Sequence, residues 1–301
     1  MTRPPVTLPR LAITLGDPRG IGAEIVRKAL ADPRVASACR WVVVGPSGLE
    51  CPADDVVGEW HARQSVANAG RLAGKAIARA VALCQRGEAD GMVTAPIDKH
   101  ALLEGGFDYP GHTEMLAALT GREVAMMLAS DRLRVVLATT HVALRDVPAL
   151  LTSDVIARVA RIARDGLRAA FGIAEPRIAL CALNPHAGDG GRFGGEDDAV
   201  LAPAARANGL LGPFPADTVF VRAMRGEFDA VIAPYHDVGM TAIKVASFGS
   251  AVNVTLGLPF PRTSPDHGTA LDIAGQGKAD ASSMIEAILL AARLVGGTPG
   301  R

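Results

Sequence analysis

Short runs of β-branched and aliphatic residues alternate along the chain with longer segments whose apolar residues recur at helical spacing. In one helical segment, Val155, Val159, Ile162 and Leu167 fall on one face. This alternation is typical of βαβ units around a mostly parallel sheet. The predicted strands are Leu11–Leu15, Trp41–Gly45, Gly91–Thr94, Val135–Thr140, Arg177–Leu183, Asp229–Ala233 and Val252–Leu256, and the predicted helices are Ile21–Ala31, Ala67–Arg86, Leu151–Phe171 and Ser282–Val295.

The length of 301 residues allows either one large α/β domain or two domains around a cleft. The sequence contains no internal repeat, low-complexity tract or obvious linker. Turns rich in proline and glycine, such as Asn184–Gly195 and Leu256–Arg262, follow predicted strands instead. Ligands of open α/β sheets bind beyond the carboxyl ends of the strands, so we expect the functional residues in these turns.

Composition and charge narrow the class of protein. With 49% hydrophobic residues, 4% aromatic residues and 33 glycines, the chain has the composition of a compact enzyme and not of a disordered or fibrous protein. Lys and Arg together number 31, as do Asp and Glu, so no net field would attract nucleic acid or an anionic membrane. An anion-binding site must therefore be local.

The sequence shows no sign of secretion or membrane insertion. The N-terminal stretch is interrupted by prolines, and the apolar stretch from Ile285 to Val295 is short and contains Arg293. The cysteines are scattered and include no CxxC pair, so neither a disulfide framework nor a cysteine zinc site is predicted. We expect reduced thiols in the cytoplasm; the four residues are Cys39, Cys51, Cys84 and Cys181.

A histidine follows each of three predicted strands. His141 ends Val135–Thr140, His186 follows the strand that ends near Leu183, and His236 follows Asp229–Ala233. Imidazoles at equivalent strand ends can converge on one ion, since zinc and similar metals bind neutral imidazole nitrogens. A histidine in this position can also merely bond a turn, and the spacing leaves both interpretations open.

Two loops carry further candidates. The segment Asn184–Gly191 combines His186 with glycines that would let the backbone approach a substrate, although it could equally be a flexible turn. The segment Tyr109–Glu114 places His112 and Thr113 near a helix start, where free backbone N–H groups suit a phosphate. In the alternative interpretation Thr113 caps the helix and His112 is solvated.

Lys244, Asn253 and Arg262 lie around a strand and the turn after it. An arginine fork and a lysine point charge together suit a phosphate plus a carboxylate, although each residue alone is more often an ordinary surface residue. The segment Gly16–Gly22 follows a strand and opens a helix, so it could receive a cofactor at the helix N-terminus. It is not the GxGxxG fingerprint, and a standard Rossmann site is not predicted.

Several blocks of the sequence resemble one enzyme family from about Leu11 to Val295. In order they are LGDPRGIGAE, TAPIDKHAL, YPGHTEML, ATTHVALRD, LNPHAGDGGRFGGED, GPFPADTVF, APYHDVGM and NVTLGLPFPRTSPDHGTALDIAGQGKAD. The chain is thereby identified as a member of the 4-hydroxythreonine-4-phosphate dehydrogenase family of pyridoxal phosphate biosynthesis. It departs from relatives in a shorter region Pro46–Arg63 and in the pair Asp98-Lys99, where relatives carry His-Lys or Asn-Lys.

The resemblance implies an α/β fold of two α/β/α domains around a cleft, similar to isopropylmalate and isocitrate dehydrogenases. Residues 1–130 with 250–301 would form the cofactor-side domain, and residues 131–249 the domain of the metal and dimer interface. In the implied homodimer a divalent ion, Zn²⁺, Mg²⁺ or Co²⁺, lies at the subunit interface. Its implied ligands are His141, His186 and His236, and the implied substrate contacts are His112, Thr113, Lys244, Asn253 and Arg262.

The segment from Asp266 to Gly275 is similar to the cofactor loop of isopropylmalate and isocitrate dehydrogenases. That similarity would place Asp266, His267, Gly268 and Thr269 along the adenosine half of NAD, with Gly16 and Asp17 nearer the nicotinamide. The alternative is a glycine-rich turn before a helix.

The implied activity is oxidation of 4-hydroxy-L-threonine 4-phosphate by NAD or NADP to 2-amino-3-oxo-4-phosphooxybutanoate, which decarboxylates to 3-amino-2-oxopropyl phosphate. Lys244, Asp237 and Asp217 are candidates for the acid or base that this oxidation needs. One alternative is a D-erythronate or D-threonate 4-phosphate dehydrogenase. A second, from another class, is a non-catalytic binder of phosphorylated acids, since a fold alone does not establish activity.

Overall fold

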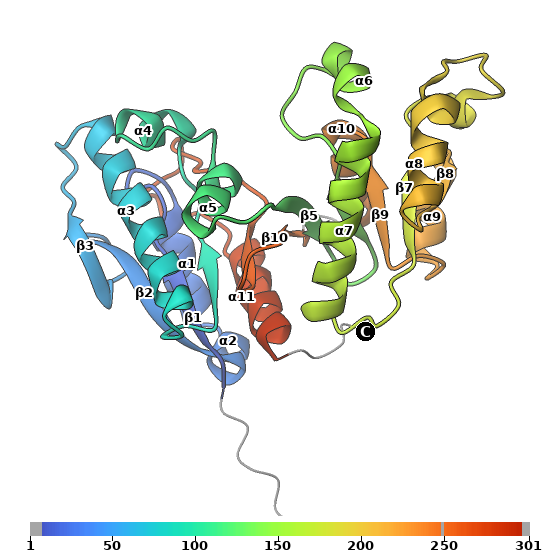
Figure 1. The fold of residues 1–301 in the computed structure, drawn as a ribbon. Coiled ribbons are helices and arrows are strands. Elements are labelled where there is room, and N and C mark those ends of the chain that lie inside the picture. Colours follow the sequence, from blue (N-terminus) through green and yellow to red (C-terminus); the bar gives the residue numbers. More distant parts are fainter. Residues whose placement is uncertain (1–7, 248–249, 297–301) are drawn as a thin grey trace, which may run out of the picture. The chain divides into compact units, whose positions relative to one another are not determined.

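The computed structural model describes residues 8–247 and 250–296 (Figure 1). The chain folds into two compact units. Of the described residues, unit 1 contains 8–122 and 258–296, and unit 2 contains 123–247 and 250–257. The chain thus leaves the first unit and returns to it.

Unit 1 is a parallel sheet covered by helices. Its strands lie in the order β3-β2-β1-β4-β11, and every neighbouring pair is parallel. The strands are β1 (Arg10–Thr14), β2 (Arg40–Ser47), β3 (Asp55–Glu59), β4 (Gly91–Thr94) and β11 (Arg262–Pro265). The helices are α1 (Gly22–Leu30), α2 (Pro33–Ala38), α3 (Val66–Gln85), α4 (Lys99–Glu104), α5 (His112–Thr120) and α11 (Ser282–Val295).

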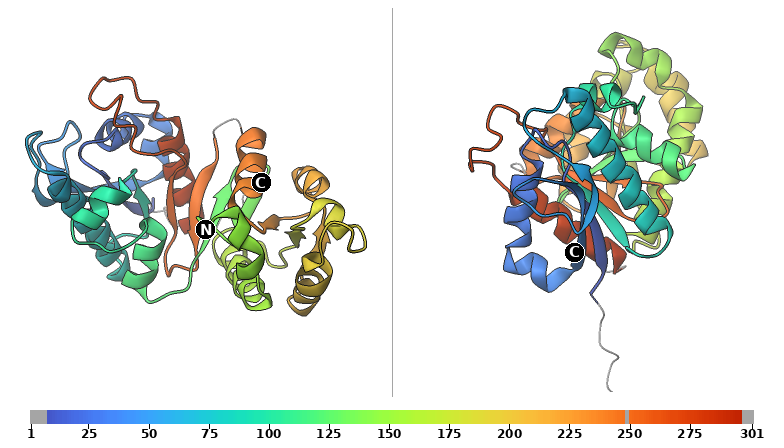
Figure 2. Two further views of the ribbon diagram at one scale, coloured as in Figure 1. Left: turned by 90° about the horizontal axis from the view of Figure 1, so that it is seen from above. Right: turned by 90° about the vertical axis from the view of Figure 1, so that its left-hand side faces the viewer.

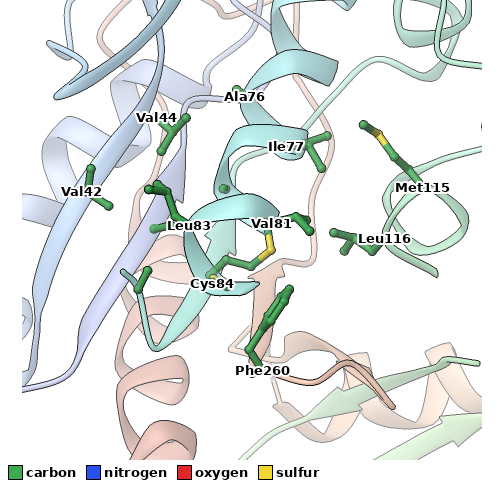
Figure 3. Packing of buried hydrophobic residues seen from close by; sticks show 14 of the residues in the cluster. Val42, Val44, Ala76, Ile77, Val81, Leu83, Cys84, Met115, Leu116 and Phe260 are labelled. Atoms are coloured by element: carbon green, nitrogen blue, oxygen red, sulfur yellow. The ribbon is translucent and has the colours of Figure 1, made fainter. Parts of the chain in front are cut away.

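The core of unit 1 fixes the position of α5. Val42 and Val44 of β2 face Ile77 and other apolar residues of α3, and α5 contributes Met115 and Leu116 to the same cluster (Figure 3). Helix α11 packs on the opposite face of the sheet, against β11 and β4. Because Met115 and Leu116 are fully buried, they hold the first turn of α5 in a defined place.

Unit 2 is a mixed sheet in the order β10-β5-β6-β9-β7-β8. The pairs β10/β5 and β5/β6 are antiparallel, and the remaining pairs are parallel. The strands are β5 (Ala125–Ala129), β6 (Arg134–Leu137), β7 (Ile178–Cys181), β8 (Leu211–Phe214), β9 (Ala230–Ala233) and β10 (Val252–Leu256). The helices include α6 (Val147–Leu150), α7 (Ser153–Ala169), α8 (Ala202–Ala207), α9 (Ala216–Met224) and α10 (His236–Ser247).

Helices α7 and α10 cover opposite faces of this second sheet (Figure 2). Gly239 of α10 lies against Val135 and Leu137, whereas Gly166 of α7 lies against Leu256 on the other face. Each unit is therefore a three-layer α/β/α arrangement, which confirms the predicted fold class.

The predicted strands and helices are all present, with ends that differ by a few residues. The domain boundaries expected at residues 130 and 250 differ from the observed division, because β5 and β10 pair with each other and β5 pairs with β6. Both strands therefore belong to unit 2. Among residues 8–247 and 250–296, no helix has the length and apolar content needed to cross a membrane. All four cysteines are buried as free thiols.

Candidate functional site

The three candidate metal ligands follow neighbouring strands of unit 2. His141 comes four residues after β6, His236 opens α10 directly after β9, and His186 lies in the 3-10 turn η2 (Pro185–Gly188) after β7. The strands β6, β9 and β7 are adjacent and parallel, so their carboxyl ends share one edge of the sheet. Because neighbouring strands lie about 4.8 Å apart, this edge brings the histidines into one region.

His141 and His236 lie close together within the chain. Their ring centroids are 5.4 Å apart, with an interplanar angle of 43°. Nδ1 of His236 lies 2.7 Å from Oδ1 of Asp237, so this carboxylate orients the imidazole ring. Two imidazoles, one of them oriented by a carboxylate, form a donor set that suits Zn²⁺ or a similar ion.

The turn that carries His186 has a strained backbone, and hydrogen bonds to Asp197 hold its start. His186 and Ala187 have φ angles of 52° and 56°, which are uncommon for residues with a Cβ. Just before them, the buried carboxylate of Asp197 accepts hydrogen bonds from the backbone N–H groups of Leu183 (2.8 Å) and Asn184 (3.0 Å). Asp197 therefore fixes the start of the turn, which is consistent with a functional position for His186.

A single chain does not assemble the full ligand set. In the part of the chain that the structure describes, no group of three or more His, Cys, Asp or Glu side chains is placed to hold a metal. The ring of His186 instead packs near Phe193, with centroids 6.3 Å apart. His141 and His236 fit the expected ion, and the ligand role of all three histidines remains a prediction.

Unit 1 contains a buried guanidinium, that of Arg262. Arg262 in β11 is 1% exposed, and its Nη2 donates to Oγ1 of Thr94 at the end of β4 (2.6 Å). Burial lowers the pKa of Arg262 to about 9. An anion bound beside this guanidinium would offset the cost of burying its charge.

His112 is the first residue of α5 and lies near Arg262. Its Nε2 is sealed from solvent and has no hydrogen-bond partner among the described residues. Burial, followed by the positive charges of Arg262 and Lys99, lowers the pKa of His112 well below its usual value. The N-cap of α5 is Gly111, so the interpretation of Thr113 as the cap is wrong. A neutral imidazole and the free N–H groups of α5 thus adjoin Arg262, as a phosphate site requires.

The other two candidate substrate residues belong to unit 2. Asn253 lies in β10, and its Oδ1 is buried with no partner among the described residues. Lys244 is an exposed residue of α10, about 12 Å along the helix axis from His236. Of the proton-transfer candidates, Asp237 lies beside His236 on α10, and Asp217 is exposed in the first turn of α9.

The two predicted cofactor segments are neighbours in unit 1. The backbone N–H of Ile21 donates to the carbonyl oxygen of Thr269 (3.0 Å), and a Cβ on Gly20 would lie 2.8 Å from that oxygen. Asp17 is buried and accepts two hydrogen bonds from the guanidinium of Arg19, at 3.0 and 2.7 Å. Gly16 has a φ of 71° and packs against the carbonyl of Pro96. Asp17 thus shapes the turn before α1.

The remaining cofactor candidates lie where β11 ends. The N–H of Asp266 donates to Oγ of Ser283 (3.3 Å) in α11, and the exposed His267 places Nδ1 3.1 Å from the carbonyl of Gly268. The sequence interpretation missed Thr94 and Asp197. Only Thr94 carried a usable signal, since it is a polar residue at the carboxyl end of a predicted strand.

Known proteins resemble this chain over almost its whole length. The chain is 44% identical to a 4-hydroxythreonine-4-phosphate dehydrogenase of Geobacter metallireducens, over 98% of this chain and 100% of the relative. It is also 44% identical to a relative from Bradyrhizobium diazoefficiens with the provisional name D-threonate 4-phosphate dehydrogenase, over 97% of this chain and 98% of the relative.

Solved structures extend the comparison. A crystal structure of 4-hydroxythreonine-4-phosphate dehydrogenase from Klebsiella pneumoniae has a TM-score of 0.84 and 39% identity, over 95% of this chain and 99% of that one. Isocitrate dehydrogenase from Methylococcus capsulatus is 15% identical over 95% of this chain and 88% of its own; its TM-score of 0.50 shows the fold alone. The sequence model for pyridoxal phosphate biosynthetic protein PdxA matches residues 38–291. The chain therefore belongs to the PdxA family.

Proposed function

We propose that this chain is an NAD(P)-dependent dehydrogenase that oxidises 4-hydroxy-L-threonine 4-phosphate to 2-amino-3-oxo-4-phosphooxybutanoate. This β-keto acid then decarboxylates to 3-amino-2-oxopropyl phosphate, a step in the biosynthesis of pyridoxal 5'-phosphate. The observation that carries the proposal is the buried Arg262 near the neutral His112 at the start of α5, which suits an anion, in a chain with near full-length relatives of that name.

We assign substrate binding to the charged Arg262 together with neutral hydrogen-bond donors. Arg262, the neutral His112 and the free N–H groups at the start of α5 would bind one anionic group of the substrate, with Thr113 beside them. Lys244 and Asn253 would bind the remaining polar groups, because the buried Oδ1 of Asn253 needs a donor. A substrate with a phosphate and a carboxylate satisfies both requirements.

His141, His236 and His186 would hold the divalent ion, Zn²⁺, Mg²⁺ or Co²⁺. Such an ion lowers the pKa of a neighbouring hydroxyl and so favours loss of hydride from its carbon. Asp237 orients the imidazole ring of His236. Asp237, Asp217 and Lys244 are the candidates for the proton acceptor; Asp237 bonds His236, and Lys244 lies on the same helix.

The hydride acceptor would be NAD or NADP. The loop from Asp266 to Thr269 and the turn Gly16–Asp17 would bind it, since the bond from Ile21 to Thr269 joins the two segments. The glycine at position 20 leaves room for this close approach. We place the enzyme in the cytoplasm, where its buried thiols would stay reduced.

A homodimer would complete the metal site. Several large apolar side chains are exposed on the loops of unit 2 that carry the histidines, a pattern typical of a surface that is covered in an assembly. They are Val142 (40% exposed), Leu144 (66%), Leu150 (45%) and Phe193 (50%).

Subunit mixing tests this shared site. Pairs of inactive variants chosen from His141→Ala, His186→Ala and His236→Ala are denatured together and refolded. If ligands come from both subunits, at least one pair should regain about a quarter of the wild-type activity, since half the dimers are mixed and each has one intact site. If no pair regains activity, each site belongs to a single chain.

The activity is tested by NADH or NADPH formation with 4-phosphorylated four-carbon acids, before and after chelation. We expect a kcat/KM for 4-hydroxythreonine 4-phosphate at least about tenfold above that for D-erythronate or D-threonate 4-phosphate, because an ammonium partner left unpaired by a hydroxyl costs about 1–3 kcal/mol. The reverse ranking would establish the alternative that the Bradyrhizobium relative represents. Binding without turnover of any acid would indicate a non-catalytic protein. Full activity after exhaustive chelation would exclude the metal.

A further inference from the structure

The loop between β11 and α11 in unit 1 is exposed along most of its length. Residues from His267 to Lys278 include Leu271, which is 46% exposed, and two glycines with positive φ, Gly275 and Gly277. Loops of this kind sample many conformations unless the structure holds them. A ligand that binds such a loop has to order it, which weakens binding.

Helix α1 holds this loop at two places. The first is the bond from the N–H of Ile21 to the carbonyl of Thr269. The second lies about two turns further along α1, where Lys28 Nζ donates to the carbonyl oxygens of Gly277 (2.9 Å) and Ala279 (2.7 Å). The exposed segment between Thr269 and Gly277 is therefore hydrogen-bonded to α1 and its N-cap at both ends.

Glu24 completes the second attachment. It is 1% exposed, and its Oε1 accepts from Lys28 Nζ (2.7 Å) and from the N–H of Ala279 (2.9 Å). The hydrogen bond from Lys28 lowers the pKa of Glu24, so its carboxylate is charged at neutral pH. Glu24 and Lys28 lie four residues apart on one face of α1, as this geometry requires.

We propose that Glu24 and Lys28 are positioning residues that fasten the 266–279 loop to α1 in the conformation that receives the nicotinamide cofactor. The inference rests on the proposed function, because it assigns cofactor binding to this loop. We call the contacts of Glu24 and Lys28 with Gly277 and Ala279 the clasp. A lysine ammonium has three donors, and in the clasp Lys28 uses all three. An apolar pair could fill the same space but could not form directional hydrogen bonds with two carbonyl groups.

The test compares Lys28→Met with the matched control Lys278→Met. Lys278 lies in the same loop, but within the described part of the chain its Nζ donates only to Oε1 of Gln276, at 3.1 Å. Amide hydrogen exchange of residues 266–281 is measured in the protein without ligands. NAD and NADP affinities are measured by calorimetry, and kcat and substrate KM at saturating cofactor.

In Lys28→Met we expect faster exchange of the Ala279 amide and a cofactor Kd raised about tenfold, the loss typical of hydrogen bonds to a charged group. Values of kcat and substrate KM should stay within about twofold of wild type, because α1 carries no proposed substrate ligand. Lys28→Arg should recover most of the affinity, and Lys278→Met should match wild type. If Lys28→Met does not fold, Glu24→Gln takes its place with the same expected results.

Two failures are distinguishable. If wild type binds cofactor and Lys28→Met binds it equally well, the clasp is refuted and the proposed function stands. If wild type binds neither nucleotide, the assignment of the loop and the inference that rests on it both fall. Faster exchange with unchanged affinity would also overturn the proposal, since it would leave the clasp a purely structural role.

Discussion

Replacing Arg262 by methionine should stabilise the protein while removing its activity. Burial lowers the pKa of Arg262 to about 9, and at about 1.4 kcal/mol per pH unit this is a cost on the order of 5 kcal/mol for the charged form. Methionine keeps most of the apolar length but leaves the buried Thr94 hydroxyl without its donor, which costs about 1–3 kcal/mol. The balance predicts a gain of about 2 kcal/mol, or roughly 4–8 °C in Tm.

The gain should depend on pH and on ligand. The folded pKa of Arg262 lies below its unfolded value, so the penalty is fully present below pH 9 and is relieved as the pH rises above it. The Tm difference between Arg262→Met and wild type should therefore be constant from pH 6 to 8 and shrink at higher pH. Substrate should raise the Tm of wild type but not of the variant.

Thermal unfolding at pH 7, with and without substrate, checks the prediction alongside steady-state kinetics. Arg262→Lys is the matched control, because it keeps the charge and loses only the planar fork. It should raise KM about tenfold without any gain in Tm. A Tm of Arg262→Met below that of wild type in the absence of ligand would refute the claim that the buried charge is costly.

Three further substitutions test the supports of the site. Asp197→Asn should weaken metal binding about 10–100-fold in calorimetry, as loss of a group that orients a ligand usually does, whereas the exposed Asp198→Asn should not. Glu24→Gln should destabilise the protein by a constant amount above pH 5. The difference should vanish as the pH falls from 4.5 through the lowered pKa of Glu24, because the hydrogen bonds stabilise only the charged carboxylate. Denaturant titrations at several pH values measure this difference. Gly16→Val should lower Tm, since its Cβ would lie 2.2 Å from the Pro96 carbonyl at a φ of 71°.

The sequence predicted most of the strands that contain an apolar run and missed β3, β5, β8 and β11. β1 and β9 are continuous apolar runs and were predicted. β3 is a half-exposed edge strand with alternating residues, and β8 contains Pro213, so neither has an apolar run. β5 was missed although AMMLA is apolar, because a short run of this kind is equally compatible with a helix.

The same division applies to the site. Histidines at strand ends are visible in a sequence because the strands before them are visible. Asp197 is not, since its carboxylate acts on the backbone of residues 13 and 14 positions earlier in the chain. The clasp of Lys28 on Ala279 joins residues separated by 251 positions, and only folding brings them together.

Strand β11 shows why function and stability conflict in this chain. Its sequence, Arg262-Thr263-Ser264-Pro265, contains no apolar run, and yet each of these residues is buried. Thr263 donates to the carbonyl of Ala287 in α11 (2.7 Å), so it is satisfied by its own fold. Arg262 places a buried charge in the same strand, and its desolvation has a free-energy cost that an apolar residue would not incur. The proposed substrate anion would offset this cost, and it accounts for a guanidinium at a position where stability alone favours an apolar residue.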